Sequence, residues 1–64
     1  MKAKELGFYL IKRALERGER YLRRGQIIPA IAELREAVHY MLQEGLEAEA
    51  GRIQLLILEL EKKI

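Results

Sequence analysis

Gly25 and Gly45 divide this chain of 64 residues into three short segments. Each glycine follows a run of strong helix formers, at a place where helices commonly end on a residue with positive φ. The segments predict helices over residues 2–24, 27–44 and 46–63. Pro29 falls in the first turn of the second helix, where its missing N–H breaks no helical hydrogen bond. Connections this short make consecutive helices antiparallel neighbours.

The composition supports a single all-α domain over residues 1–64. The chain has no Ser, Thr, Asn, Asp, Cys or Trp, and is rich in Ala, Leu, Ile, Glu, Lys and Arg. Apart from Ile, these are strong helix formers. The length allows one domain, close to the lower limit for a self-sufficient core. We therefore predict a three-helix antiparallel bundle, with a composition typical of thermophile proteins and also of engineered sequences.

The first predicted helix carries a line of small residues on its apolar side. Glycine inside a helix costs roughly 1 kcal/mol relative to alanine, so two glycines on this line need a compensating reason. Close approach of another helix is one reason, and a ligand lying on the line is the alternative. We predict close helix packing at four positions: Ala3, Gly7, Ala14 and Gly18.

The second predicted helix has one apolar stripe, and the third has two. In the second helix the stripe contains Ile27, Ile31, Leu34, Val38 and Met41, flanked by Ala30 and Ala37. The main stripe of the third helix contains Leu46, Ala50, Ile53, Ile57, Leu60 and Ile64. A further line lies roughly 120–200° around that helix; it contains Ala48, Gly51, Leu55 and Leu58. One copy of the chain cannot cover both stripes, so we predict a homodimer or a higher even-numbered oligomer joined through this further line.

Residues 14–42 resemble one tetratricopeptide repeat, a helix–turn–helix unit. The matching positions are Gly18, Tyr21, Gly25 at the turn, Ala30, Leu34 and Ala37. Three positions depart from the family pattern: Ala14 replaces Trp, Arg17 replaces Leu, and Leu42 replaces Pro. The resemblance covers about half of the chain and implies a helical hairpin followed by a capping helix.

Three-helix microtubule-interacting-and-transport domains also look similar, in length and in the Ala-rich second helix. Both resemblances imply binding of a helical peptide or protein without catalysis, and a plain three-helix bundle remains the alternative. The leading hypothesis is therefore a non-catalytic protein–protein interaction or oligomerisation module. An engineered helical bundle without natural function stays open beside it.

The residue types needed for catalysis or metal binding are scarce. Ser, Thr and Cys, the usual side-chain nucleophiles, are absent, and we expect neither enzyme activity nor a cofactor. Glu36 and His39 have the Glu-x-x-His spacing of di-iron bundles, but they point away from the apolar stripe of their helix. We therefore predict no metal site. Tyr9 and Tyr40 also fall outside the apolar stripes, where each is either an interface residue or a lone surface aromatic.

Basic residues gather in the first predicted helix. Residues 1–24 hold eight basic and three acidic side chains, whereas residues 25–64 hold four basic and seven acidic ones. One side of the helix carries Lys2, Arg13, Arg17, Arg20 and Arg24. Such a row can follow a phosphate backbone, which makes a small nucleic-acid-binding protein the alternative function. The net charge is only +2, so nucleic acid is the less favoured partner.

The apolar runs are short and interrupted by charged residues. We therefore expect no membrane-spanning segment, no signal peptide and a cytoplasmic location.

Overall fold

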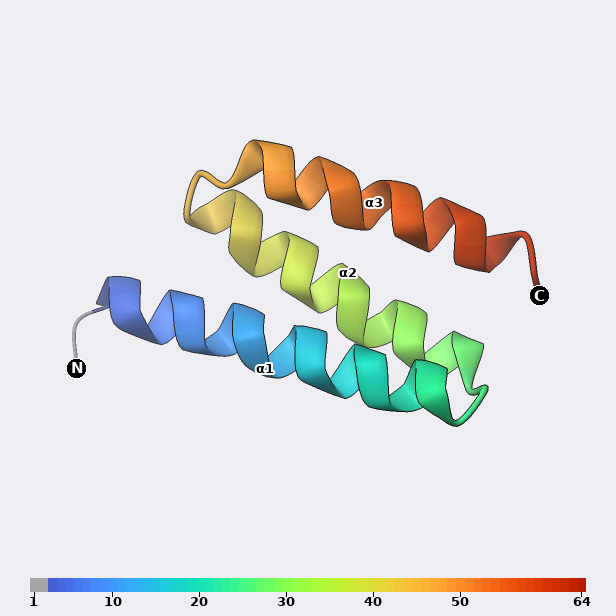
Figure 1. Ribbon diagram of the computed structural model, residues 1–64. Coiled ribbons are helices and arrows are strands. Elements are labelled where there is room, and N and C mark those ends of the chain that lie inside the picture. The colour runs from blue at the N-terminus through green and yellow to red at the C-terminus, as the bar shows by residue number, and fades with distance from the viewer. Residues whose placement is uncertain (1–2) are drawn as a thin grey trace.

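The chain folds into three antiparallel α-helices joined by two short turns (Figure 1). A computed structural model describes residues 3–64, with side chains from residue 5 onwards. Helix α1 spans Ala3–Arg23, α2 spans Ile27–Gln43 and α3 spans Glu47–Glu61. The predicted all-α, three-helix architecture is confirmed. The described helices end slightly earlier than predicted because Arg24, Glu44, Lys62 and Lys63 belong to turns; residue 2 of the predicted first helix lies outside the described residues.

The two turns are built in the same way, around a glycine with positive φ. Gly25 has a φ of 74° and Gly45 has a φ of 77°. After α1, the N–H of Gln26 donates to the carbonyl of Tyr21 at 2.9 Å. After α2, the N–H of Leu46 donates to the carbonyl of Met41 at 2.8 Å. Both are the six-to-one hydrogen bond of a Schellman motif, which satisfies carbonyls left over at a helix end.

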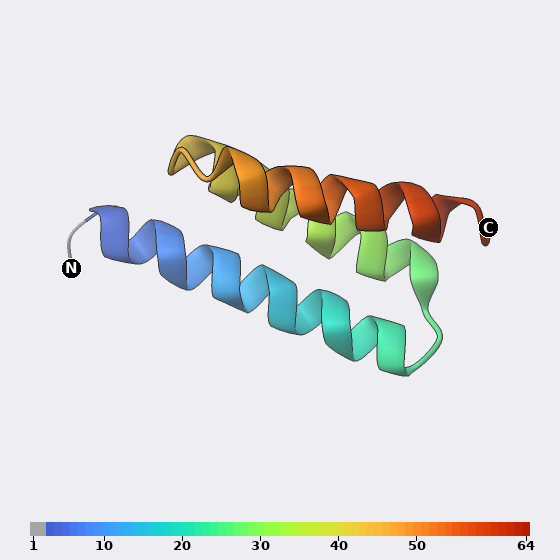
Figure 2. The same ribbon diagram turned by 45° about the horizontal axis from the view of Figure 1, so that its top comes forward.

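Helix α2 lies between the other two helices. Among residues 3–64, Cα atoms of α2 come within 8 Å of both α1 and α3, whereas no Cα of α1 comes that close to α3. Figure 2 shows α1 and α3 as separate rods, each beside α2. The molecule is elongated, measuring 38 × 21 × 12 Å along its principal axes. Helices α1 and α3 are therefore each held in place mainly by α2.

The core is centred on the apolar stripe of α2. Its buried residues are Ala30, Ile31, Leu34, Ala37, Val38 and Met41, and Ile27 is half-buried. Helix α1 adds Ile11 and Ala14, and α3 adds Ala50, Ile57 and Leu60. The stripe predicted for the second helix is thus the centre of one continuous core.

Helices α1 and α2 approach closely at Gly18. A Cβ atom built on Gly18 would lie 3.1 Å from Leu34 Cδ2 and 3.6 Å from the carbonyl oxygen of Ala30. Ala14, one turn earlier on α1, is buried. At Gly7 the neighbour is the flexible side chain of Glu44, whose Oε2 would lie 2.5 Å from an added Cβ. The side chain of Ala3 lies outside the part of the chain whose side chains are described.

The main stripe of α3 packs on α2, with one exception at its end. Leu46 and Ile53 are half-buried and contact the core. Ile64, predicted as the last member of this stripe, is 69% exposed. The prediction was wrong there because α3 ends at Glu61, so the helical period that places Leu60 in the core does not continue to Ile64.

Candidate functional site

One face of α3 is apolar and is left exposed by α2. We call it the outer face of α3 and define it by Ala48, Gly51, Leu55 and Leu58. Leu55 is 65% exposed and Leu58 is 55% exposed, and Ala48 is also exposed. A Cβ added to Gly51 would meet no atom within 4 Å, so this position is open space. The outer face thus combines two uncovered leucines with a gap beside them.

The outer face has charged groups at its two ends. Glu47 and Glu49 lie in the first turn of α3. Lys62 and Lys63 follow the last turn, and Lys62 Nζ lies 3.2 Å from Glu59 Oε1. Acidic groups at a helix N-terminus and basic groups at its C-terminus also agree with the helix dipole. The N-terminal end of the face is therefore negative, and the C-terminal end carries both signs, with Glu59 and Glu61 beside Lys62 and Lys63.

A shallow depression of about 380 Å³ adjoins the outer face between α2 and α3. Leu58 forms one side of it, and Arg35, Val38, Gln54 and Ile57 form the rest. Because Leu58 belongs to both features, the exposed apolar surface continues from α3 onto α2.

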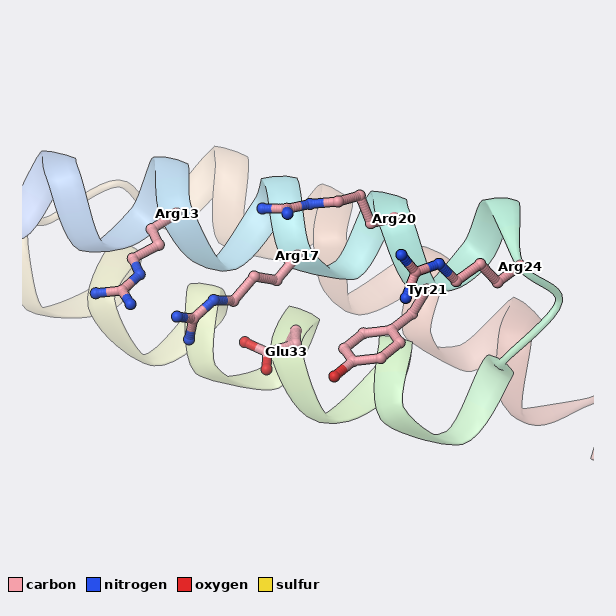
Figure 3. Close-up of a pocket in the computed structure, with 6 residues that line it drawn as sticks. All are labelled: Arg13, Arg17, Arg20, Tyr21, Arg24 and Glu33. Carbon is pink, nitrogen blue, oxygen red and sulfur yellow. The ribbon is translucent and has the colours of Figure 1, made fainter.

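A second candidate site lies on the opposite edge of the molecule, between α1 and α2. It is a groove of about 520 Å³, and we call it the arginine groove. Its lining residues are Arg13, Arg17, Arg20, Tyr21, Arg24 and Glu33. Figure 3 shows Arg13 and Arg17 extending from α1 towards α2, with Glu33 of α2 opposite Arg17 and the Tyr21 ring on the other side of Glu33. The four arginines predicted on one side of this helix thus share one concave site.

Among the described residues, two arginines outside the groove, Arg23 and Arg35, form ion pairs. Arg23 pairs with Glu19 on α1, and Arg35 of α2 pairs with Glu61 of α3. No carboxylate of the described residues lies within 4.0 Å of the guanidinium groups of the four groove arginines. Glu16 and Arg20 are four residues apart on α1, a spacing that allows an ion pair, but they form none. Glu59 is also four residues before Lys63, but it pairs with Lys62 instead.

The groove continues along α1 and α2 into a smaller hollow of about 130 Å³. Tyr40 and Glu36 lie at its end. The hydroxyl of Tyr40 donates to Glu36 Oε1 at 3.1 Å, and this hydrogen bond raises the pKa of Tyr40 above its ordinary value. Partial burial and the negative charge of Glu36 act in the same direction. Tyr40, which the sequence had placed outside the apolar stripe, also contacts the core.

Within the part of the chain that the structure describes, no grouping of side chains is suited to a metal ion. Among the described residues, no set of three or more His, Cys, Asp or Glu side chains is close enough to hold one. His39 is exposed, and its Nε2 lies 3.2 Å from Gln43 Nε2. Glu36 is engaged by Tyr40 instead. Glu36 and His39 therefore each contact a different neighbouring side chain, Tyr40 and Gln43 respectively.

The sequence pattern predicted the arginines of the groove but not its other lining residues. Lys2, the first residue of the predicted basic row, lies outside the described residues. Tyr21 and Glu33 were not assigned to the groove. Tyr21 follows Arg17 by four residues and precedes Arg24 by three, so helical spacing could have placed it on the arginine side. Glu33 comes from the neighbouring helix, and only the packing of α2 on α1 brings it there.

Comparison of the chain with protein-family models, with curated proteins and with solved structures finds no match. Within residues 3–64, none of the helices combines the length and apolar character that crossing a membrane requires.

Proposed function

We propose that this chain is a non-catalytic self-association module that forms a symmetric homodimer through the outer face of α3. The observation that supports the proposal is the exposure of Leu55 and Leu58, on a face that α2 cannot cover. Soluble domains rarely leave a contiguous apolar patch uncovered unless it serves an interaction. A second copy of the chain is the occupant that fits this face best, because the face is complementary to itself.

The complementarity follows from an antiparallel pairing of two α3 helices about a two-fold axis. With Leu55 opposite Leu55 of the second copy, Leu58 reaches the open position at Gly51. In the same register Lys62 lies beside Glu47 of the second copy, so opposite charges meet at both ends. A parallel pairing would instead place like charges together. In a symmetric dimer each of these contacts occurs twice.

The expected affinity is moderate. Fully burying a leucine contributes roughly 1.5–3 kcal/mol, and Leu55 and Leu58 are already partly covered. The four leucines of a dimer supply most of the apolar burial, and the depression beside Leu58 extends it, so we expect a dimer that dissociates on dilution rather than a permanent one.

Light scattering after size exclusion tests the proposal. The wild-type chain should have twice the monomer mass at tens of micromolar, and Leu55→Glu/Leu58→Glu should have the monomer mass. The matched control is Ile28→Glu/Ile64→Glu, because both isoleucines are at least as exposed but lie away from the outer face. A wild-type monomer at this concentration, or equal dissociation in the control, would contradict the proposal.

Charge exchange gives a second test that does not depend on the leucines. Lys62→Glu should weaken the dimer, and adding Glu47→Lys should restore it, because the two groups then meet with their signs reversed. Helicity measured by circular dichroism confirms that each variant is folded. If the double variant is as weak as Lys62→Glu, the antiparallel register is wrong.

We further infer that Ala14–Leu42 forms a tetratricopeptide-like hairpin. The close approach of Gly18 to Ala30 and Leu34 supports it, because these three residues are among those that carry the resemblance. The glycine turn between α1 and α2 also lies where that family has its turn. Under this proposal α3 takes the place of the next repeat's first helix, and the outer face of α3 is the surface that a further repeat would cover.

A further inference from the structure

We propose that the arginine groove binds single-stranded nucleic acid, with its arginines on the phosphates and Tyr21 stacked on a base. This site is separate from the outer face of α3 and does not depend on self-association. The two features share no residue and lie on different helices.

The spacing and chemistry of the groove arginines suit a row of phosphates. Arg13, Arg17, Arg20 and Arg24 follow one another at intervals of about 4.5–6 Å along the axis of α1. A guanidinium group binds phosphate through two parallel N–H donors, which a lysine ammonium cannot do. The four arginines therefore offer a line of phosphate sites rather than one diffuse positive charge.

Four arginines and one glutamate give the lining of the groove a net charge of +3, concentrated in a small part of the surface. Of the carboxylates, only Glu33 lines the groove, and Glu36 lies in the hollow that continues it. In the described part of the chain no carboxylate lies within 4.0 Å of the groove arginines, so their positive charge is only partly compensated. Like charges in a concave site repel each other and attract an anionic ligand. The small net charge of +2 therefore does not argue against polyanion binding at this place.

Tyr21 and the shape of the groove favour a single strand over other polyanions. The Tyr21 ring lies in the groove beside the arginines (Figure 3), where an unpaired base can stack on it. In a duplex the faces of the bases are covered by their neighbours and cannot reach the ring. A bilayer surface is flat and does not follow a groove between two helices. An acidic protein segment would satisfy the arginines but would make no comparable use of the aromatic ring.

In this proposal Glu33 determines which side of the groove the phosphates of the bound nucleic acid occupy. Its carboxylate lies on α2, facing the arginines across the groove (Figure 3), and it repels phosphates from that side. The phosphates are thereby confined to α1, while the bases and sugars lie towards α2. There Glu33 can accept a hydrogen bond from a base amino group or a sugar hydroxyl.

Fluorescence anisotropy with labelled single-stranded DNA and RNA tests the site. In Arg17→Gln/Arg20→Gln we expect an affinity loss of at least about tenfold. The control Arg23→Gln/Arg52→Gln removes the same charge outside the groove and should change affinity less than about twofold. The logarithm of the binding constant should fall with the logarithm of salt concentration with a slope of about −3, as expected for four contacts to a single strand. Equal losses in both variants would overturn the proposal.

The aromatic contact has its own test. Tyr21→Leu should weaken binding by about tenfold, while Tyr21→Phe keeps the ring and should bind like the wild type. Inorganic polyphosphate of equal charge should compete poorly, because it has no bases. Equal competition by polyphosphate, or tighter binding to an acidic polypeptide or to anionic vesicles than to the oligonucleotides, would overturn the assignment. Repeating the titration in Leu55→Glu/Leu58→Glu shows whether binding survives without the proposed dimer, as we expect.

Discussion

A Cβ atom on Gly18 of α1 would lie 3.1 Å from Leu34 Cδ2 of α2. This separation is tighter than ordinary van der Waals contact, and Leu34 is only 3% exposed. Leu34 is surrounded by other core residues and has little room to move away. The glycine is therefore a requirement of the packing between α1 and α2, despite its cost to helix formation.

The first prediction concerns Gly18→Ala. Alanine favours the helix by roughly 1 kcal/mol, but overpacking a core typically costs about 1–3 kcal/mol. We expect a net loss in the free energy of unfolding, measured by urea denaturation. An increase in stability would show that Leu34 moves aside more easily than its burial indicates.

The second prediction concerns Gly51→Ala, the matched substitution at an open position. With no neighbour within 4 Å, the added methyl group should stabilise the isolated chain by roughly 1 kcal/mol. Thermal melting in the Leu55→Glu/Leu58→Glu background should show a rise of about 4–8 °C. In the wild-type background the same substitution should weaken the proposed dimer, because it fills the gap for Leu58 of the second copy. A stronger dimer would contradict that register.

The third prediction concerns the pH dependence of Tyr40. The hydrogen bond to Glu36 raises the pKa of Tyr40 in the folded chain above its ordinary value of 10.0. The stability due to this bond is then fully present below pH 10 and is lost as the pH rises through the folded-state pKa. In Glu36→Ala the pKa of Tyr40 should return towards its ordinary value. Ultraviolet titration of tyrosinate measures the change, and Glu59→Ala, which lies on α3, should leave the titration unaltered.

The fourth prediction concerns the ion pair of Arg35 and Glu61, which joins α2 to α3. The two side chains are 61% and 38% exposed, so water screens much of their attraction. A double-mutant cycle with Arg35→Ala and Glu61→Ala should give a coupling below about 1 kcal/mol. High salt should reduce it further. A coupling of several kcal/mol would mean that this pair, rather than the apolar contacts, holds α3 on α2.

Local patterns were sufficient to predict the helices and the turns. Gly25 and Gly45 have the positive φ expected of them, and the stripe containing Leu34 and Met41 is buried as its spacing requires. These features depend on neighbours within a few residues along the chain. Ile64 shows where such reasoning fails, because an apolar period can continue in the sequence after the helix has ended.

The candidate sites were only partly predictable, because some of their features depend on how the helices pack and not on neighbours along the chain. The arginine row follows from spacing within one helix, and so does the second line of α3. The presence of Glu33 in the groove depends on how α2 packs against α1, which helical periodicity alone does not determine. The lack of an ion pair between Glu16 and Arg20 depends on side-chain rotamers, which the sequence does not fix.

The position of α2 between its two neighbours also bears on how the chain folds. The contacts between helices are made between segments that are consecutive in the sequence. Each requires closing only a short turn, so little loop entropy is lost before packing energy is gained. Either hairpin can form first and then receive the remaining helix, as in a linear array of repeats. A chain of this kind should reach its native state in microseconds to milliseconds, with the residues of α2 ordered earliest and the free edges of α1 and α3 last.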